Sequence, residues 1–219
     1  MHEPVIIIEN VCKSFRENKI LDNISVNFTN NRIHGLVGRN GSGKSMLLKC
    51  ICGFTPVTSG EIIVNGKKIG KDVDIPNDVG IIIESPGFLP NYSGYKNLEF
   101  LASINKHITK AEIKATIERV GLDPDNRKWV GKYSLGMRQR LGIAQAIMEN
   151  PPILLLDEPL NGIDKHGIKD IRNLLLQLRD EGKTIVLASH SAEDIDILCD
   201  AVYEMDEGKL EIVRELSSM

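Results

Sequence analysis

Two short stretches in the second half of the chain decide its fold: YSLGMRQR at residues 133–140 and ILLLDE at residues 153–158. The second stretch begins with a continuous apolar run, as expected of a parallel strand covered on both faces, and it ends in Asp157 and Glu158. Upstream, residues 38–45 spell GRNGSGKS, which matches the phosphate-binding pattern G-x-x-x-x-G-K-[ST]. A strand is expected at 33–37, before this loop, and a helix at 44–52, after it. This order predicts an α/β nucleotide-binding fold.

Composition and charge exclude several classes of protein. The 219 residues suit one domain, or one domain with an inserted lobe. No apolar run reaches spanning length and no basic segment leads into an apolar one at the N-terminus, so neither an integral membrane protein nor a secreted one is expected. The 27 basic and 30 acidic residues give a net charge of −3 without a long like-charge block, which argues against a nucleic-acid partner. The four scattered cysteines suit a cytosolic protein.

The periodicity of the sequence changes twice along the chain. Antiparallel strands are expected at 5–8 and 24–28, and a hairpin at 61–64 that closes at Asn65-Gly66. From about Pro86 the pattern becomes helical, with a capping box formed by Thr109 and Glu112. After Pro151-Pro152 the α/β pattern resumes, with a helix from Asp164 to Gly182, a strand at 184–188, a helix opened by Ser191 and a hairpin at 206–208.

We therefore expect a single domain over residues 1–219. Residues 1–85 and 151–219 should form an α/β core with a mixed, mainly parallel sheet and an N-terminal antiparallel β part. Residues 86–150 should form an inserted helical lobe, because they interrupt two parts of what looks like one sheet.

The glycine-rich loop supplies the first candidate site. Its glycines let successive backbone N–H groups converge on phosphates, and the start of the following helix adds positive potential. Lys44 supplies a point charge and Ser45 a ligand for Mg²⁺. The alternative to a phosphate-binding loop is a fortuitous glycine-rich turn. The predicted nucleotide-binding residues are Gly38, Arg39, Asn40, Gly41, Ser42, Gly43, Lys44, Ser45 and Met46.

The two acids at 157–158 supply the second candidate site. Asp157 can hold Mg²⁺ through its water shell, and Glu158, one residue further on, can orient or deprotonate an attacking water. Two adjacent acids at a strand end are otherwise often a solvated edge of the sheet.

Taken together, these motifs resemble the ATP-binding subunit of an ATP-binding-cassette (ABC) transporter, over nearly the whole chain. The resemblance implies an ATPase that uses ATP and Mg²⁺, and Glu158 as its catalytic base. His190 occupies the family's switch-histidine position, where it contacts the γ-phosphate or holds the catalytic acid; an isolated histidine after a strand is otherwise usually structural. Phe15 occupies the position of the aromatic that stacks on adenine, although it could equally belong to the core.

The resemblance also implies a head-to-tail dimer with two ATP sites. Ser134, Leu135, Gly136 and Met137 correspond to the signature that reaches ATP held by the other subunit. Tyr133, Leu135 and Met137 depart from its commonest form, Leu-Ser-Gly-Gly-Gln. Asp164 falls in the loop that crosses the dimer interface, and it can also act as a helix N-cap.

Glu84 stands where most family members carry a glutamine that touches Mg²⁺. A carboxylate there brings a full charge to the metal, so Glu84 is a candidate catalytic and metal-binding residue. With the loop at 85–98, it resembles the bacitracin-resistance and lantibiotic self-protection subgroup, whose members drive separate permeases and are implicated in removing peptide antibiotics.

This subgroup implies a location on the inner face of the plasma membrane, bound to permease subunits. Phe88, Leu89 and Tyr92 lie in the loop that family members turn towards the permease, although they could instead pack inside the helical lobe; Trp129 shares this ambiguity.

Alternative functions are export of another drug or ion, a nucleotide-sensing regulatory subunit with low turnover, a soluble ATPase machine of the same cassette type, and a P-loop kinase. A soluble machine of the cassette type lacks support, because such proteins carry long insertions or paired cassettes and this chain has neither. A P-loop kinase lacks support, because it leaves the signature, Asp164 and His190 unexplained.

Overall fold

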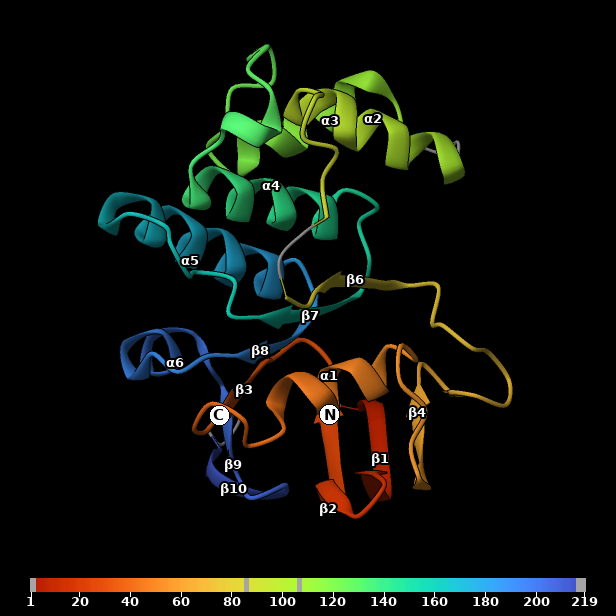
Figure 1. Ribbon diagram of the computed structural model, residues 1–219. Coiled ribbons are helices and arrows are strands. Elements are labelled where there is room, and N and C mark those ends of the chain that lie inside the picture. Colours follow the sequence, from red (N-terminus) through yellow and green to blue (C-terminus); the bar gives the residue numbers. More distant parts are fainter. Residues whose placement is uncertain (1–2, 85–86, 106–107, 216–219) are drawn as a thin grey trace.

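The computed structural model describes residues 3–84, 87–105 and 108–215, in which a mixed sheet runs through the centre of the molecule (Figure 1). Its strand order is β10-β9-β3-β8-β7-β6, and every neighbouring pair is parallel except β9 and β10. The strands are β3 (Ile33–Val37), β6 (Val79–Ile82), β7 (Ile153–Asp157), β8 (Thr184–Ala188), β9 (Ala201–Asp206) and β10 (Lys209–Glu215). The predicted fold class, α/β with a mixed parallel sheet, is confirmed.

A second, antiparallel sheet with the order β2-β1-β4-β5 is built from the N-terminal part. Its strands are β1 (Pro4–Phe15), β2 (Asn18–Thr29), β4 (Ser59–Val64) and β5 (Lys67–Lys68). The predicted turn at Asn65-Gly66 is confirmed, with left-handed φ values of 49° and 75°. β1 and β2 are far longer than the sequence pattern indicated, because register shifts near Asn10 and Asn23 interrupt the alternation of apolar and polar residues without ending the pairing.

The helices of residues 94–147 lie together at the top of the molecule in Figure 1. They are α2 (Gly94–Asn105), α3 (Lys110–Arg119), a 3₁₀ turn (Val130–Lys132) and α4 (Leu135–Ile147). The predicted capping box of α3 is confirmed, because the Thr109 hydroxyl accepts from the Glu112 amide and the Glu112 carboxylate accepts from the Thr109 amide. The predicted boundary between core and lobe, at 85–86, lies outside the described residues.

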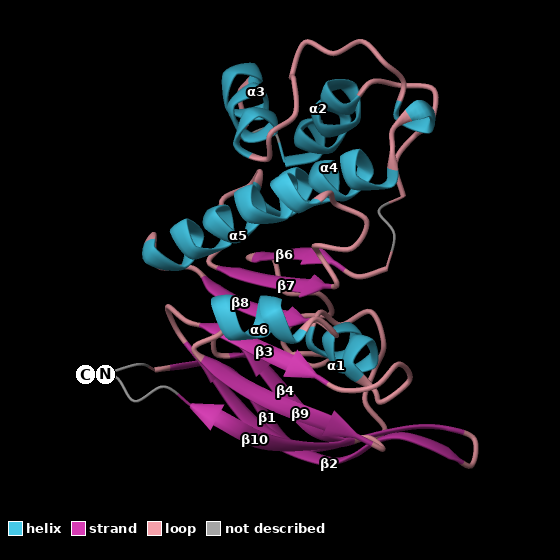
Figure 2. Ribbon diagram, turned by 90° about the vertical axis from the view of Figure 1, so that its left-hand side faces the viewer, coloured by secondary structure: helices cyan, strands magenta, loops and turns pink. Residues whose placement is uncertain are grey.

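The mixed sheet buries both of its faces. On β7, Ile153 and Leu155 pack towards α1 (Lys44–Ile51) and the antiparallel sheet, whereas Leu154 and Leu156 pack towards the other helices. Those helices include α5 (Lys165–Asp180) and α6 (Ala192–Leu198). In Figures 1 and 2, α5 lies between α4 and the sheet. This two-sided burial explains why β7 has a continuous apolar sequence.

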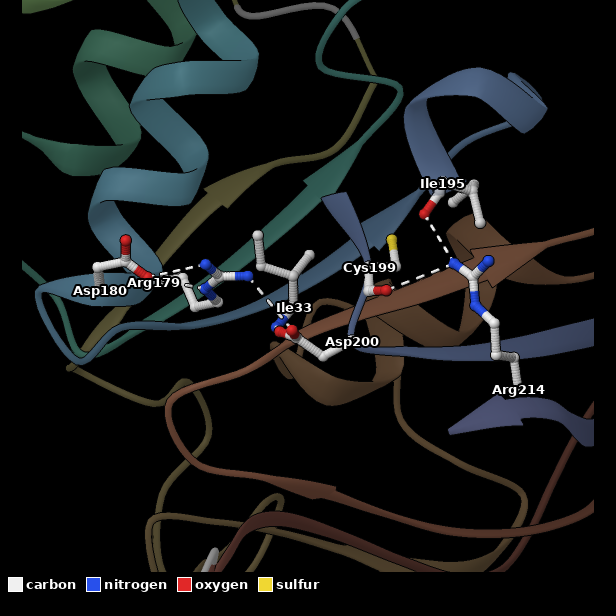
Figure 3. Close-up of polar contacts among 7 residues, drawn as sticks. All are labelled: Ile33, Arg179, Asp180, Ile195, Cys199, Asp200 and Arg214. Atoms are coloured by element: carbon white, nitrogen blue, oxygen red, sulfur yellow. Dashed lines mark hydrogen bonds and ion pairs between the residues drawn. The ribbon is translucent and has the colours of Figure 1, made fainter. Parts of the chain in front are cut away.

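Polar contacts fix the end of the sheet opposite the glycine-rich loop (Figure 3). Asp200 accepts a hydrogen bond from the Ile33 amide at 2.8 Å and pairs with Arg179, at the end of α5, at 3.2 Å. Arg214 of β10 donates to the carbonyl oxygens of Ile195 and Cys199 at the end of α6. These contacts tie the end of α5 to the start of β3, inside the sheet, and the end of α6 to the edge strand β10. No helix of the described part of the chain is long and apolar enough to cross a bilayer.

Candidate functional site

The glycine-rich loop connects β3 to α1 and curls around the side chain of Lys44. The Lys44 ammonium donates to the carbonyl oxygens of Gly38 at 2.7 Å and Arg39 at 3.0 Å. Gly38 has a φ of 146°, and a Cβ there would lie 2.2 Å from the carbonyl oxygen of Met205, so only glycine fits. The Ser42 hydroxyl is buried without a hydrogen-bond partner among the described residues. The loop therefore presents a buried cation and an unused polar group, as a phosphate site requires.

The structure brings Ser45 and Asp157 together, although 112 positions separate them. The Ser45 hydroxyl, in the first turn of α1, donates to Asp157 Oδ2 at the end of β7 at 2.5 Å. Both side chains end in hard oxygen atoms, the ligands that Mg²⁺ prefers. Within the described residues no three His, Cys, Asp or Glu side chains form a metal cage. One hydroxyl and one carboxylate suit an ion that keeps waters and takes further oxygens from a phosphate.

Glu158 and His190 meet beyond the ends of two adjacent strands. β7 and β8 pair in parallel, so the residues that follow them meet at one edge of the sheet. His190 Nδ1 lies 2.9 Å from Glu158 Oε2; the Glu158 side chain is 23% exposed and that of His190 60%. The arrangement joins a carboxylate that can take a proton to an imidazole that can orient it.

A cavity of about 680 Å³ opens in front of the loop and the two acids. Of the predicted site residues, those that line it are Asn40, Gly41, Gly43, Lys44, Ser45, Met46, Glu84, Leu135, Asp157 and Glu158. Ser42 belongs to the loop behind it, and Gly38, Arg39 and His190 line a neighbouring hollow next to α6. The sequence analysis missed Ile20, Gln139 and Asn161, which also line the cavity. Gln139 carried a signal, because it lies in the same helical segment as the signature, whereas Ile20 carried none.

Glu84 follows β6 and reaches the rim of the cavity, where Lys49 holds it. The Lys49 ammonium, in the last turn of α1, lies 2.5 Å from Glu84 Oε1, and the Glu84 side chain is 69% exposed. Glu84 also adopts a left-handed φ of 63°, which is unusual for a residue with a side chain. The sequence did not predict this cationic partner. The role of Glu84 as a metal ligand stays a prediction.

Phe15 is half exposed at the end of β1, so the alternative that it belongs to the core is wrong. The Lys13 ammonium lies 4.5 Å from the centre of its ring. Phe15 does not line the cavity itself. Stacking on adenine stays a prediction.

The signature and the Asp164 loop touch each other. The Ser134 hydroxyl accepts from the Met137 amide and caps α4, and Asp164 accepts from the Gly167 amide at 2.8 Å and caps α5, which confirms its predicted capping role. The pKa of Asp164 is lowered, mainly by the hydrogen bond from the Gly167 amide. Gly162 has a φ of 74°, and a Cβ there would lie 2.4 Å from Leu135 Cδ2. The first turn of α4, which includes Gly136, therefore packs directly on this loop.

The predicted docking residues of the helical lobe divide into two groups. Phe88 is partly buried against the core, as the alternative interpretation held. Leu89 and Tyr92 are 48% and 45% exposed, and Trp129 is 52% exposed. Tyr92 packs edge-on against Phe100, whose ring is also exposed. These four residues, Leu89, Tyr92, Phe100 and Trp129, form what we call the lobe apolar patch.

Comparison with known proteins shows the family to which the chain belongs. Residues 21–161 match the family model described as ABC transporter. The chain is 46% identical over 207 residues to the uncharacterized ABC transporter ATP-binding protein YybJ of Bacillus subtilis, covering 94% of this chain and 95% of that protein.

Two further relatives are named for the transport of bacitracin or of a lantibiotic. The chain is 40% identical to the bacitracin transport ATP-binding protein BcrA of Enterococcus faecalis, covering 95% of this chain and 68% of that protein. It is 35% identical to the lantibiotic transport ATP-binding protein SrtF of Streptococcus pyogenes, covering 95% and 90%.

Among solved structures, the dimeric bacterial ABC transporter cassette MJ0796 superposes with a TM-score of 0.87 at 24% identity, covering 98% of this chain and 100% of that one. From the match to the family model and the identity to these relatives, the chain belongs to the ABC transporter family, as an ATP-binding subunit that hydrolyses ATP.

Proposed function

We propose that the chain hydrolyses ATP to power a separate membrane permease that removes a peptide antibiotic of the bacitracin or lantibiotic type. The observation that carries the catalytic part is the convergence of Lys44, Ser45, Asp157 and Glu158 on one cavity, with His190 2.9 Å behind Glu158. The cargo is supported by the relatives BcrA and SrtF, which carry bacitracin and lantibiotic transport in their names.

In this proposal Ser45 and Asp157 would hold Mg²⁺, and Glu84, which lines the same cavity, would be a further oxygen ligand. The metal neutralises charge on the phosphate oxygens when it is bound. Lys44 and the loop N–H groups bind the phosphates, and Asn40 and Met46 line the same cavity. Glu158 accepts the proton of the attacking water, and His190 holds the carboxylate in line.

We propose that two ATPase subunits, copies of this chain or this chain and a related subunit, close head to tail on ATP. Ser134, Leu135, Gly136 and Met137 would contact the nucleotide of the other subunit, and the Asp164 loop would cross the interface. The support is exposure: Leu135 is 54% exposed even though it begins a helix that is otherwise well packed. Ser134 and Asp164 are also exposed.

The lobe apolar patch is the proposed contact with the permease, on the inner face of the membrane. Its four apolar residues are all exposed, and Tyr92 packs edge-on against Phe100, which favours a protein partner. The division into a core at 1–85 and 151–219 and an inserted lobe at 86–150 fits this arrangement, because the lobe would carry both the patch and the signature.

The test is antibiotic protection in cells that express the chain together with its cognate permease. We expect the pair to raise tolerance to bacitracin or to a lantibiotic, and Lys44→Ala to remove this protection because ATP no longer binds productively. Unchanged tolerance to both antibiotic classes, with the protein expressed and hydrolysing ATP, would reject the proposed cargo. Export of another drug or ion would then be tested in the same cells, which express the permease with either the wild-type chain or Lys44→Ala.

A further inference from the structure

Gln139 lies on α4 and joins that helix to the backbone of Glu158. Its side chain is only 8% exposed and lines the nucleotide cavity. Its amide nitrogen donates to the carbonyl oxygen of Glu158 at 3.2 Å. The contact spans two elements, because α4 belongs to the helical segment above the sheet whereas Glu158 follows β7 (Figure 1).

The backbone of Glu158 needs such support. Its φ is 49°, in the left-handed region, which is strained for a residue with a side chain and persists only where neighbours hold it. The Glu158 amide donates to the Ala188 carbonyl at 2.9 Å, and its own carbonyl accepts from the Asn161 amide at 3.2 Å as well as from Gln139. Because the backbone sets the direction of the side chain, these contacts decide where the carboxylate meets His190.

We propose that Gln139 is a positioning residue for ATP hydrolysis, which holds Glu158 in place and makes this acid sensitive to the position of α4. The inference rests on the proposed role of Glu158. α4 begins at Leu135, in the segment proposed to touch the nucleotide of a second subunit, and Gln139 lies about 6 Å further along the same helix. A shift of the first turn of α4 therefore moves the donor that holds Glu158. Hydrolysis in one subunit thus responds to the nucleotide in the other site.

The decisive variant is Gln139→Met, which keeps the length of the side chain and removes its donor. Its control is Gln145→Met, the same substitution at a half-buried position of the same helix. We expect Gln139→Met to lower kcat about tenfold, the effect of one lost hydrogen bond on the barrier, with KM for ATP unchanged. The Hill coefficient for ATP should fall towards one, and the control should match wild type. An unchanged Hill coefficient would overturn the coupling to α4.

Two further measurements separate positioning from a loss of structure. Gln139→Lys retains N–H donors on a side chain of similar reach, so it should recover most of the rate; a rate as low as that of Gln139→Met would overturn the role of the hydrogen bond. In a Glu158→Gln background, Gln139→Met should cause no further loss, because it acts through Glu158.

The outcomes also distinguish this inference from the proposed function. A second tenfold loss in the Glu158→Gln background would assign Gln139 a merely structural role. A wild-type rate for Gln139→Met, beside an inactive Glu158→Gln, would reject only the inference. An active Glu158→Gln would reject the proposed role of Glu158 itself.

Discussion

The ammonium of Lys49 lies 2.5 Å from the carboxylate of Glu84 and links the last turn of α1 to the segment that follows β6. Lys49 belongs to the helix that the glycine-rich loop begins, and Glu84 stands at the point where most relatives in the resembled family carry an amide. The pair is largely exposed on the Glu84 side, so its own contribution to stability is small. Its importance lies in position, because Glu84 lines the same cavity as Ser45 and Asp157 while its carboxylate pairs with the Lys49 cation.

We expect Glu84→Gln to retain ATP binding but to change the metal dependence of hydrolysis, because an amide offers the ion a dipole instead of a charge. Glu84→Ala should impair turnover more severely. The measurement is the ATPase rate against Mg²⁺ and Mn²⁺ concentration. Lys49→Met, which frees the carboxylate, should shift the metal response in the direction opposite to Glu84→Gln. If the ATPase rate depends on Mg²⁺ and Mn²⁺ concentration in the same way in the wild type and in all variants, Glu84 is an ordinary solvated carboxylate.

We expect Lys44→Ala to abolish productive ATP binding and Glu158→Gln to retain binding while trapping an ATP-bound dimer. The reason is that Lys44 faces the phosphates, whereas Glu158 acts on water. Size-exclusion chromatography with ATP and Mg²⁺ should show the dimer only for Glu158→Gln, and light scattering should show a monomer without nucleotide. A tight dimer without nucleotide would contradict the proposed closure on ATP.

We expect Gly162→Ala to destabilise the protein by about 2 kcal/mol, through the strain of a Cβ at positive φ and its clash with Leu135. Urea denaturation of the wild type and the variant measures this change. The matched test is Leu135→Ala in the same background, which removes the clashing atoms and should restore part of the stability. If the double variant is as unstable as the single one, the contact between α4 and the Asp164 loop is not the cause.

We expect stability to fall as the pH drops from 6.5 to 5, because of His34. The pKa of His34 is lowered from 6.5 to about 4, mainly by burial. The His34 ring packs against the rings of Phe28 and Tyr203, and its Nε2 donates a hydrogen bond to the Thr29 carbonyl oxygen at 2.8 Å. The unfolded chain therefore takes up a proton in this window while the folded chain does not, so protonation favours unfolding. The loss should reach about 2 kcal/mol at pH 5.

Urea titrations at pH 7 and pH 5 check this expectation. His34→Phe carries no titrating group at this position, so the free energy of unfolding of this variant should differ less between pH 7 and pH 5. An equal loss in the variant would assign the pH dependence to the carboxylates instead.

Several features were predictable from sequence because they are local. The loop at 38–45, the turn at Asn65-Gly66, the Thr109 capping box and the buried strand expected at 153–156 each depend on residues within a few positions, and each is confirmed as a structural element. The length of β1 and β2 was not predictable, since pairing between strands carries them through irregular positions such as Asn10. The turn at Arg16 was also missed, because its residues are not typical of a hairpin.

The sequence by itself determined the family, the order of the elements and the residues available for phosphate, metal and water. Only the tertiary structure decided which side chains meet: Lys49 with Glu84, Gln139 with Glu158, and Leu135 with Gly162. It also decided that Phe88 packs inward while Tyr92 stays exposed. The physical reason is that a motif is set by local backbone and side-chain chemistry, whereas a contact between distant segments depends on how the packed helices and sheet place them.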